Sequence, residues 1–159
     1  MAGRGTPATA VLDAAGVTFT LISYSRDPTD TSYGLAAAAA LDIDPAAIFK
    51  TLVAAVDSAL CVAVVPVTGT LDLKALAAAR GGKRAGLAQA ALAERSSGYV
   101  VGGISPLGQR RRLPTVVDAS GLGLPVMYVS AGRRGLEIGL APGDLIALTG
   151  ATVAAISAR

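Results

Sequence analysis

The chain has 159 residues, of which 52% are hydrophobic, and it carries a formal net charge of +3. This length fits one domain over residues 1–159 with a real core, and this hydrophobicity excludes an intrinsically disordered chain. No run of about 18 apolar residues and no apolar signal core occurs, so we expect a cytoplasmic protein without a membrane partner.

Residue types that are missing narrow the chemistry further. The chain contains no histidine and no tryptophan, and its single cysteine is Cys61 in "ALCVAVVPV". Catalysis by Ser-His-Asp or Cys-His is therefore excluded, and one cysteine cannot supply a usual zinc ligand set, so we expect no metal and no cofactor. We expect Cys61 to be a buried packing residue.

The amino-terminal part of the chain alternates between helical and extended patterns. Thr6 followed by Pro7 predicts the beginning of a helix, and Gly16 predicts its end. The sequence then predicts, in order, a strand over 17–24, a loop over 25–32, a helix over 33–41 and a helical turn that begins at Asp44-Pro45.

The central part predicts a hairpin, because two apolar runs flank Asp57-Ser58. Asp72 then predicts the cap of a helix over 73–80. The remaining predictions are a turn and a short strand within 81–87, a helix over 88–96, strands over 115–119, 125–132 and 136–141, a helix that begins at Pro142 and a strand over 151–156. These elements predict one α+β domain built on a mixed, mostly antiparallel sheet.

Lys50 is a lysine in an almost wholly apolar strand, "FKTLVAAV". Alternation places it on the same face as Leu52, Ala54 and Val56. Taken alone, the pattern favours a lysine at the beginning of a strand whose ammonium reaches solvent over a functional lysine.

Two glycine-containing segments have free backbone amides that suit anionic groups. The GGISP loop, Gly102 to Pro106, allows a close backbone approach and an oxyanion contact, and "SAGRRGLE", residues 130–137, suits a phosphate. Taken alone, a tight turn and a polar hairpin explain them better, and neither is a P-loop or a dinucleotide fingerprint.

Basic residues form separate clusters, at 83–84, 110–112 and 133–134. A charge run is usually a solvated surface. Because only 4% of the residues are aromatic, there is no stacking platform, and any RNA contact would be made to phosphates. The candidate RNA-binding residues are Arg110, Arg111, Arg112, Arg133 and Arg134.

The ordered set of motifs resembles the YbaK/EbsC family, free-standing relatives of the editing domain of bacterial prolyl-tRNA synthetases. The motifs are Tyr24 with Asp27-Pro28, "FKTLV", "PVTGTLDLKALA", "RSSGYVVGGISPLGQRRRLPTVVD" and "YVSAGRRGLEIGLAPGDL". The resemblance implies a sheet curled into a barrel-like core surrounded by helices. It also implies removal of wrongly attached amino acids from tRNA, with tRNA as partner and prolyl-tRNA synthetase as a further candidate partner.

The resemblance also implies which residues form the catalytic and substrate-binding site. The essential lysine of the family falls on Lys50, and its loop falls on Gly102, Gly103, Ile104, Ser105 and Pro106. Lys50, Gly102, Gly103 and Ser105 are the expected catalytic residues; the expected substrate-binding residues are Tyr24, Thr51, Ile104, Pro106, Ser130 and Glu137. At Glu137 the sequence departs from the family pattern, which has aspartate.

A cysteinyl ester carries its own thiol beside the carbonyl carbon, and positioning can then replace a protein nucleophile. The YbaK branch of the family acts chiefly on cysteinyl-tRNA(Pro), so the resemblance implies a deacylase for Cys-tRNA(Pro), with Lys50 in an electrostatic and orienting role and loop amides as oxyanion donors. Two alternatives stay open: a deacylase for alanine or another small amino acid, and a non-catalytic tRNA-binding module of a synthetase.

Overall fold

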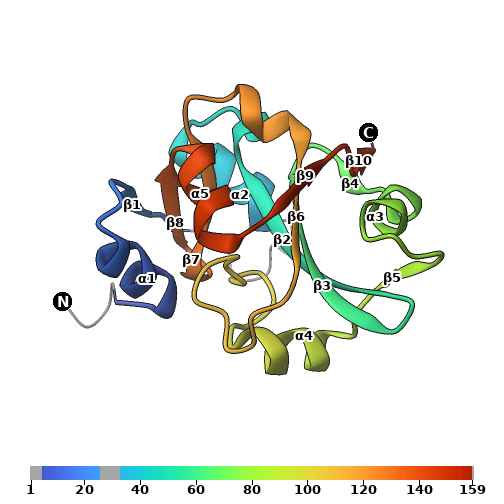
Figure 1. Cartoon of the computed structure of the whole chain (residues 1–159). Helices are drawn as coiled ribbons and strands as arrows, with labels where there is room; N and C mark the ends of the chain where they lie inside the picture. The colour runs from blue at the N-terminus through green and yellow to red at the C-terminus, as the bar shows by residue number, and fades with distance from the viewer. Residues whose placement is uncertain (1–4, 26–32, 159) are drawn as a thin grey trace.

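A long β-hairpin forms the centre of the fold in the computed structural model, which describes residues 5–25 and 33–158 (Figure 1). β2 (Phe49–Val56) and β3 (Ala59–Pro66) pair antiparallel along their whole length. Asp57 and Ser58 between them have positive φ values of 48° and 72°. Such values match the tight turns that follow the twist of paired strands, so the predicted hairpin is confirmed.

The hairpin is the middle of a five-stranded sheet in the order β5-β2-β3-β6-β9. The β5–β2 and β2–β3 pairs are antiparallel, whereas the β3–β6 and β6–β9 pairs are parallel. The added strands are β5 (Ala85–Leu87), β6 (Thr115–Asp118) and β9 (Thr152–Ala154). The predicted mixed sheet is confirmed.

A second, antiparallel sheet has the order β1-β8-β7. Its strands are β1 (Thr20–Ser23), β7 (Met127–Arg133) and β8 (Leu136–Leu140). An isolated bridge between Ile48 and Tyr128 links β7 to the segment before β2. The ladders of the described residues do not confirm closure into a barrel.

One local prediction needs correction, and the structure adds two features that the sequence did not predict. β1 is shorter than expected, because the Val17 N–H bonds Leu12 O and so still belongs to the end of the first helix. The pair of β4 (Thr70–Leu71) with β10 (Ser157–Ala158) was not expected, since two residues carry no periodicity. The same holds for the short 3-10 helix η2 (Ala119–Gly123).

Helices surround the two sheets (Figure 1). α1 contacts β7, α3 contacts β5 and α4 contacts β2. Their bounds are α1 (Pro7–Ala15), α2 (Tyr33–Leu41), α3 (Leu73–Ala79), α4 (Ala90–Ser97) and α5 (Pro142–Thr149), with the 3-10 turn η1 (Pro45–Ala47). In the described part of the chain, no helix has the length and apolarity needed to cross a bilayer.

Predicted caps explain where two of these helices begin. The Thr6 hydroxyl accepts from the Thr9 N–H and the Thr9 hydroxyl accepts from the Thr6 N–H, which forms a reciprocal capping box. The Asp72 carboxylate accepts from the Ala75 N–H at 3.0 Å. Such bonds satisfy amides that a helix leaves without partners.

The central hairpin separates two apolar clusters. Phe49 and Val53 point into the larger one, whereas Ala54, Val56 and Cys61 belong to the other. Cys61 is 1% exposed, and burial raises the pKa of its thiol, as expected for a packing cysteine. Side chains alternate between the two faces of β2, so the two faces pack in different clusters.

Candidate active site

A cavity of about 480 Å³ lies along the amino-terminal half of β2. Its walls come from the beginning of α2, from β2 itself, from the segment between β5 and α4, and from the loop that follows Tyr99. Ser130 of β7 and Glu137 of β8 also line it. Both sheets therefore contribute to a single concave site, the usual form of a small-molecule or cofactor site.

The cavity exists because β5 leaves β2 early. β5 pairs with Ala54, Ala55 and Val56, and the Ala88 N–H donates to Val53 O at 3.0 Å. Beyond Val53, no strand pairs with this edge of β2 in the described chain. The strand that carries Lys50 and Thr51 thus borders an open space instead of another strand.

Lys50 lines this cavity and is half-buried. Burial removes water from its ammonium and lowers its pKa from the ordinary value. No carboxylate forms an ion pair with Lys50 among residues 5–25 and 33–158. Leu52, Ala54 and Val56 pack in one cluster, as the alternation predicted, while Lys50 lies at the cavity end of that strand.

Glu137 is the buried acid of the cavity. It is 6% exposed, and burial raises its pKa to about 8. Ser130 lies directly opposite on β7, and the Ser130 hydroxyl accepts from the Gly132 N–H at 3.1 Å. The Glu137 carboxyl makes no hydrogen bond with the described residues. A buried, unpaired carboxyl of this kind is characteristic of functional sites.

Thr51 contributes a second polar group without a partner. Its side chain is 8% exposed, and its buried Oγ1 has no hydrogen-bond partner in the described structure. Leaving a buried hydroxyl unsatisfied costs about 1–3 kcal/mol, so such groups call for an explanation. Thr51 also lines the cavity, so this unsatisfied hydroxyl belongs to a residue of the cavity wall.

The glycine pair is explained by close packing against the two arginines of the β7–β8 turn. Gly102 has a φ of +89°, and a Cβ there would lie 2.8 Å from Arg134 Nε and from the Tyr33 ring. A Cβ on Gly103 would lie 2.6 Å from Arg133 Cα. Only glycine allows this approach, so the two segments that the sequence keeps apart pack directly against each other.

The backbone N–H groups of the GGISP loop differ in whether they already donate a hydrogen bond. Gly102 and Ile104 line the cavity, and no described carbonyl accepts from their N–H groups. The Gly103 N–H donates to Val100 O at 2.9 Å. Ser105 is fully buried, and its hydroxyl accepts from the Leu107 N–H.

The structure therefore separates the predicted loop residues into two groups. Gly102 and Ile104 face the cavity with Tyr24, Lys50, Thr51, Ser130 and Glu137, whereas Gly103 and Ser105 do not line it. Pro106 lines a second cavity of about 200 Å³. The catalytic roles of the loop stay predictions, and the geometry favours Gly102 and Ile104 as donors.

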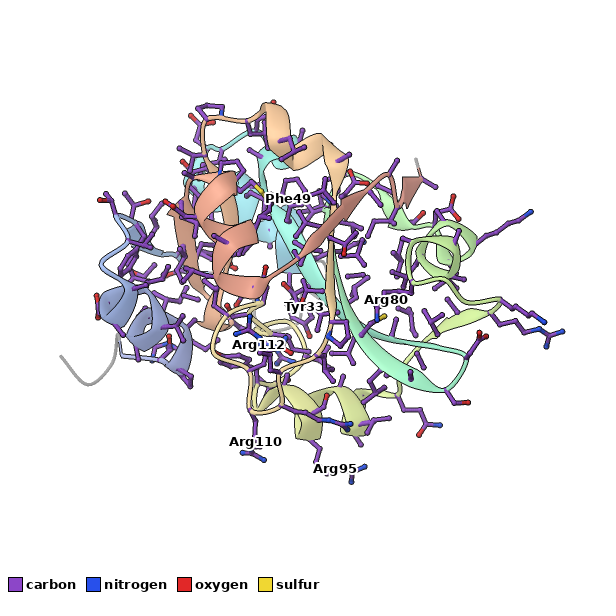
Figure 2. The ribbon with its side chains drawn as sticks, viewed as in Figure 1. Tyr33, Phe49, Arg80, Arg95, Arg110 and Arg112 are labelled. Carbon is purple, nitrogen blue, oxygen red and sulfur yellow. The ribbon has the colours of Figure 1, made fainter. Side chains whose placement is uncertain are left out.

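The two arginine clusters lie in different places. The Arg110 and Arg111 N–H groups donate to Ser97 O and Ser96 O, which holds this run at the end of α4. Figure 2 shows Arg110 and Arg95 projecting away from the body of the molecule on the α4 side. Arg112 is exposed and lines the second cavity. None of these side chains lines the larger cavity.

Arg134 does not line the larger cavity, but it contacts two residues that do. Its Nε donates to Val101 O at 2.8 Å, and its guanidinium lies 4.7 Å from the centroid of the Tyr33 ring. Tyr33 and Val101 both line the cavity, and Tyr33 is labelled in the middle of the view in Figure 2. Tyr33 was missed in the sequence, because no local pattern brings the beginning of α2 to Arg134.

No metal site accompanies the cavity in the described residues, where no three Cys, His, Asp or Glu side chains gather in a metal-binding group. Asp27-Pro28, part of the motif that carries the family resemblance, lies outside the described residues.

Comparisons with known proteins found relatives that cover most of the chain. The model of the aminoacyl-tRNA editing domain matches residues 28–148. A protein of Enterococcus faecalis named "Putative Cys-tRNA(Pro)/Cys-tRNA(Cys) deacylase EbsC" is 37% identical over 123 residues, which cover 77% of this chain and 75% of that protein.

Solved structures with a similar fold also cover most of the chain. The "crystal structure of a putative trans-editing enzyme for prolyl tRNA synthetase" matches with a TM-score of 0.84 and 25% identity, covering 96% of both chains. The crystal structure of a hypothetical protein matches with a TM-score of 0.86 and 27% identity, covering 96% of this chain and 100% of that one.

Proposed function

The chain belongs to the aminoacyl-tRNA editing domains and is an aminoacyl-tRNA deacylase, and from this premise we propose that it removes cysteine from Cys-tRNA(Pro) in trans. One observation carries the proposal. The cavity combines a half-buried lysine, an unpaired buried acid and two available backbone amides, but no cysteine or histidine. Such a site can orient and stabilise a reacting ester without attacking it.

The substrate then supplies the nucleophile. A thiol of pKa about 8.5 has a few per cent thiolate at neutral pH. The cysteinyl thiolate attacks its own carbonyl carbon, so that a C–S bond forms, the ester C–O bond breaks and the ribose oxygen takes up the proton. Water then opens the thiolactone and releases cysteine. Oriented intramolecular groups reach effective molarities on the order of 10⁵ M, which makes positioning sufficient.

Each cavity residue has a task in this reaction. The Lys50 ammonium holds the ribose end of the ester and favours the thiolate and the oxyanion. The N–H groups of Gly102 and Ile104 receive the oxyanion. Glu137, Ser130 and Tyr24 fix the α-amino group or the ribose, and Thr51 gains a partner for its hydroxyl. Prolyl-tRNA synthetase is the proposed partner, and the "trans-editing" relative supports this choice.

A second candidate, an alanyl-tRNA deacylase, is favoured by the apolar part of the wall. Val53, Ala90, Ala93 and Ile104 accept a methyl group as readily as a thiol. For such a substrate, water or a ribose hydroxyl would have to attack the carbonyl carbon.

Single-turnover deacylation of Cys-tRNA(Pro) and Ala-tRNA(Pro) tests both candidates. We expect loss of cysteine that falls about 10²-fold in Lys50→Ala, with Lys74→Ala, an exposed lysine of α3, as the matched control. Faster loss of alanine would identify the second candidate. Binding of tRNA without turnover of either ester would indicate a non-catalytic module.

A further inference from the structure

Two exposed leucines lie at the mouth of the larger cavity. Leu35 near the beginning of α2 is 49% exposed and Leu87 at the end of β5 is 60% exposed, and both line the cavity. Single exposed apolar side chains are normal on a protein surface. These two leucines, on different elements, both border the same cavity, and we call them the apolar rim. Exposed apolar side chains that border a cavity suit contact with a bound molecule.

A fixed cation lies beside the cavity, in contact with two residues that line it. The Arg134 guanidinium is held by the bond from its Nε to Val101 O and by the Tyr33 ring, two residues before Leu35. Its terminal nitrogens have no hydrogen-bond acceptor among the described residues. A guanidinium that is already positioned, with free donors, suits a phosphate.

The covalent structure of an aminoacyl-tRNA relates these two features. Its ester is carried by the ribose of the last nucleotide, and the base and the phosphate of that nucleotide are attached to the same sugar. When the ester enters the cavity, both groups must stay at its mouth. A nucleobase has apolar faces and a phosphate is an anion, so the apolar rim complements one and Arg134 the other.

We propose that the cavity mouth is a subsite for the 3′-terminal nucleotide, with the faces of its base against Leu35 and Leu87 and its phosphate on Arg134. This inference rests on the proposed function and adds where the end of the tRNA lies. Leucine side chains have no donor or acceptor that reads a base edge. The subsite therefore holds any base and requires only that one be present.

The test uses single-turnover deacylation of cysteinylated acceptor-stem minihelices that end in adenosine, in cytidine or in an abasic ribose. Leu35→Ala and Leu87→Ala should each raise the half-saturating enzyme concentration about three- to tenfold for the adenosine substrate, with the maximal rate within about twofold. Leu122→Ala is the matched control, because Leu122 is 59% exposed and does not line the cavity.

The abasic substrate shows whether the leucines act on the base. We expect it to raise the half-saturating concentration of the wild type as the leucine variants do, and to add nothing to their loss. The cytidine substrate should behave like adenosine within about threefold. Equal losses for the variants on normal and abasic ends, or no loss, would overturn the subsite while leaving the deacylase intact. No deacylation by the wild type would overturn the proposed function and the subsite with it.

Discussion

At the residue scale, the cavity depends on groups whose properties come from burial. Lys50 loses hydration and its pKa falls, while Glu137 loses hydration and its pKa rises. Burial disfavours the charged form of both, so the two shifts have one cause and opposite signs. As a result, the pKa of the lysine and the pKa of the glutamate are both shifted toward neutral pH.

Glu137 should therefore make folding stability depend on pH. Its pKa of about 8 lies above the ordinary 4.5, so the folded state binds the proton more tightly than the unfolded state. The stabilisation from the neutral carboxyl is fully present below about pH 4.5 and is lost as pH rises through about 8. Urea unfolding of the wild type and of Glu137→Gln should show a wild-type deficit of a few kcal/mol that develops over this window. Parallel stability curves for the two proteins would contradict it.

Gly102 should tolerate no side chain. A Cβ there lies 2.8 Å from Arg134 Nε and the Tyr33 ring, at a φ of +89°. We expect Gly102→Ala to lower the free energy of unfolding by about 1–3 kcal/mol and to slow deacylation. The measurement is urea unfolding with single-turnover kinetics. In Gly143→Ala, where a Cβ meets open space, activity should be unchanged, and an equal loss there would refute the packing explanation.

At the element scale, one carboxylate ties two segments to the central sheet. Asp118 at the end of β6 accepts from the N–H groups of Ile156 and Ser157 at 2.8 and 3.0 Å. Its other oxygen accepts from the Ser120 N–H and hydroxyl at 3.2 and 2.5 Å. These bonds begin η2 and hold the chain between β9 and β10.

Removing this carboxylate should loosen the carboxyl-terminal segment. Asp118→Ala leaves several amides without an acceptor, and we expect a loss of about 2–4 kcal/mol in urea unfolding together with faster proteolysis after β9. Asp44→Ala, which removes one exposed cap bond to Ala46, is the matched control and should cost about 1 kcal/mol or less. A loss no larger than that of the control would show that the Asp118 bonds do not hold the segment.

At the scale of the whole molecule, the run of three arginines does not line the larger cavity. Arg110, Arg111 and Arg112 are exposed near α4 and the second cavity, whereas Arg134 contacts Tyr33 and Val101, which line the larger one. We propose that a tRNA whose aminoacylated end enters the larger cavity contacts the α4 cluster, Arg110 to Arg112, with the phosphates of its stem. Contacts of this kind position a nucleic acid without reading its sequence.

The α4 cluster should therefore contribute affinity and salt dependence. Replacing Arg110, Arg111 and Arg112 with glutamine should weaken tRNA binding and reduce the slope of log K against log[salt] by roughly one unit for each phosphate that the variant no longer binds. The control is glutamine at Lys83 and Arg84, an exposed pair beside the turn at Asp57. If binding is unchanged across a salt titration, the run is a solvated surface.

Local interactions explain what the sequence alone determined. The caps at Thr6 and Asp72, and the turn at Asp57-Ser58, involve neighbours within a few residues, and each prediction is confirmed. The absence of histidine excludes triad chemistry on composition alone. The family could be recognised because its motifs are short and keep their order.

Only the tertiary structure decided which residues meet at the cavity. Gly102 and Arg134 are far apart in the chain, Glu137 becomes an unpaired acid through packing, and packing leaves the buried Thr51 hydroxyl without a partner in the described structure. The split of the loop, with Gly102 and Ile104 in the cavity but Gly103 and Ser105 outside it, has the same origin. Burial and amide availability are set by long-range contacts, which no local pattern of residues encodes.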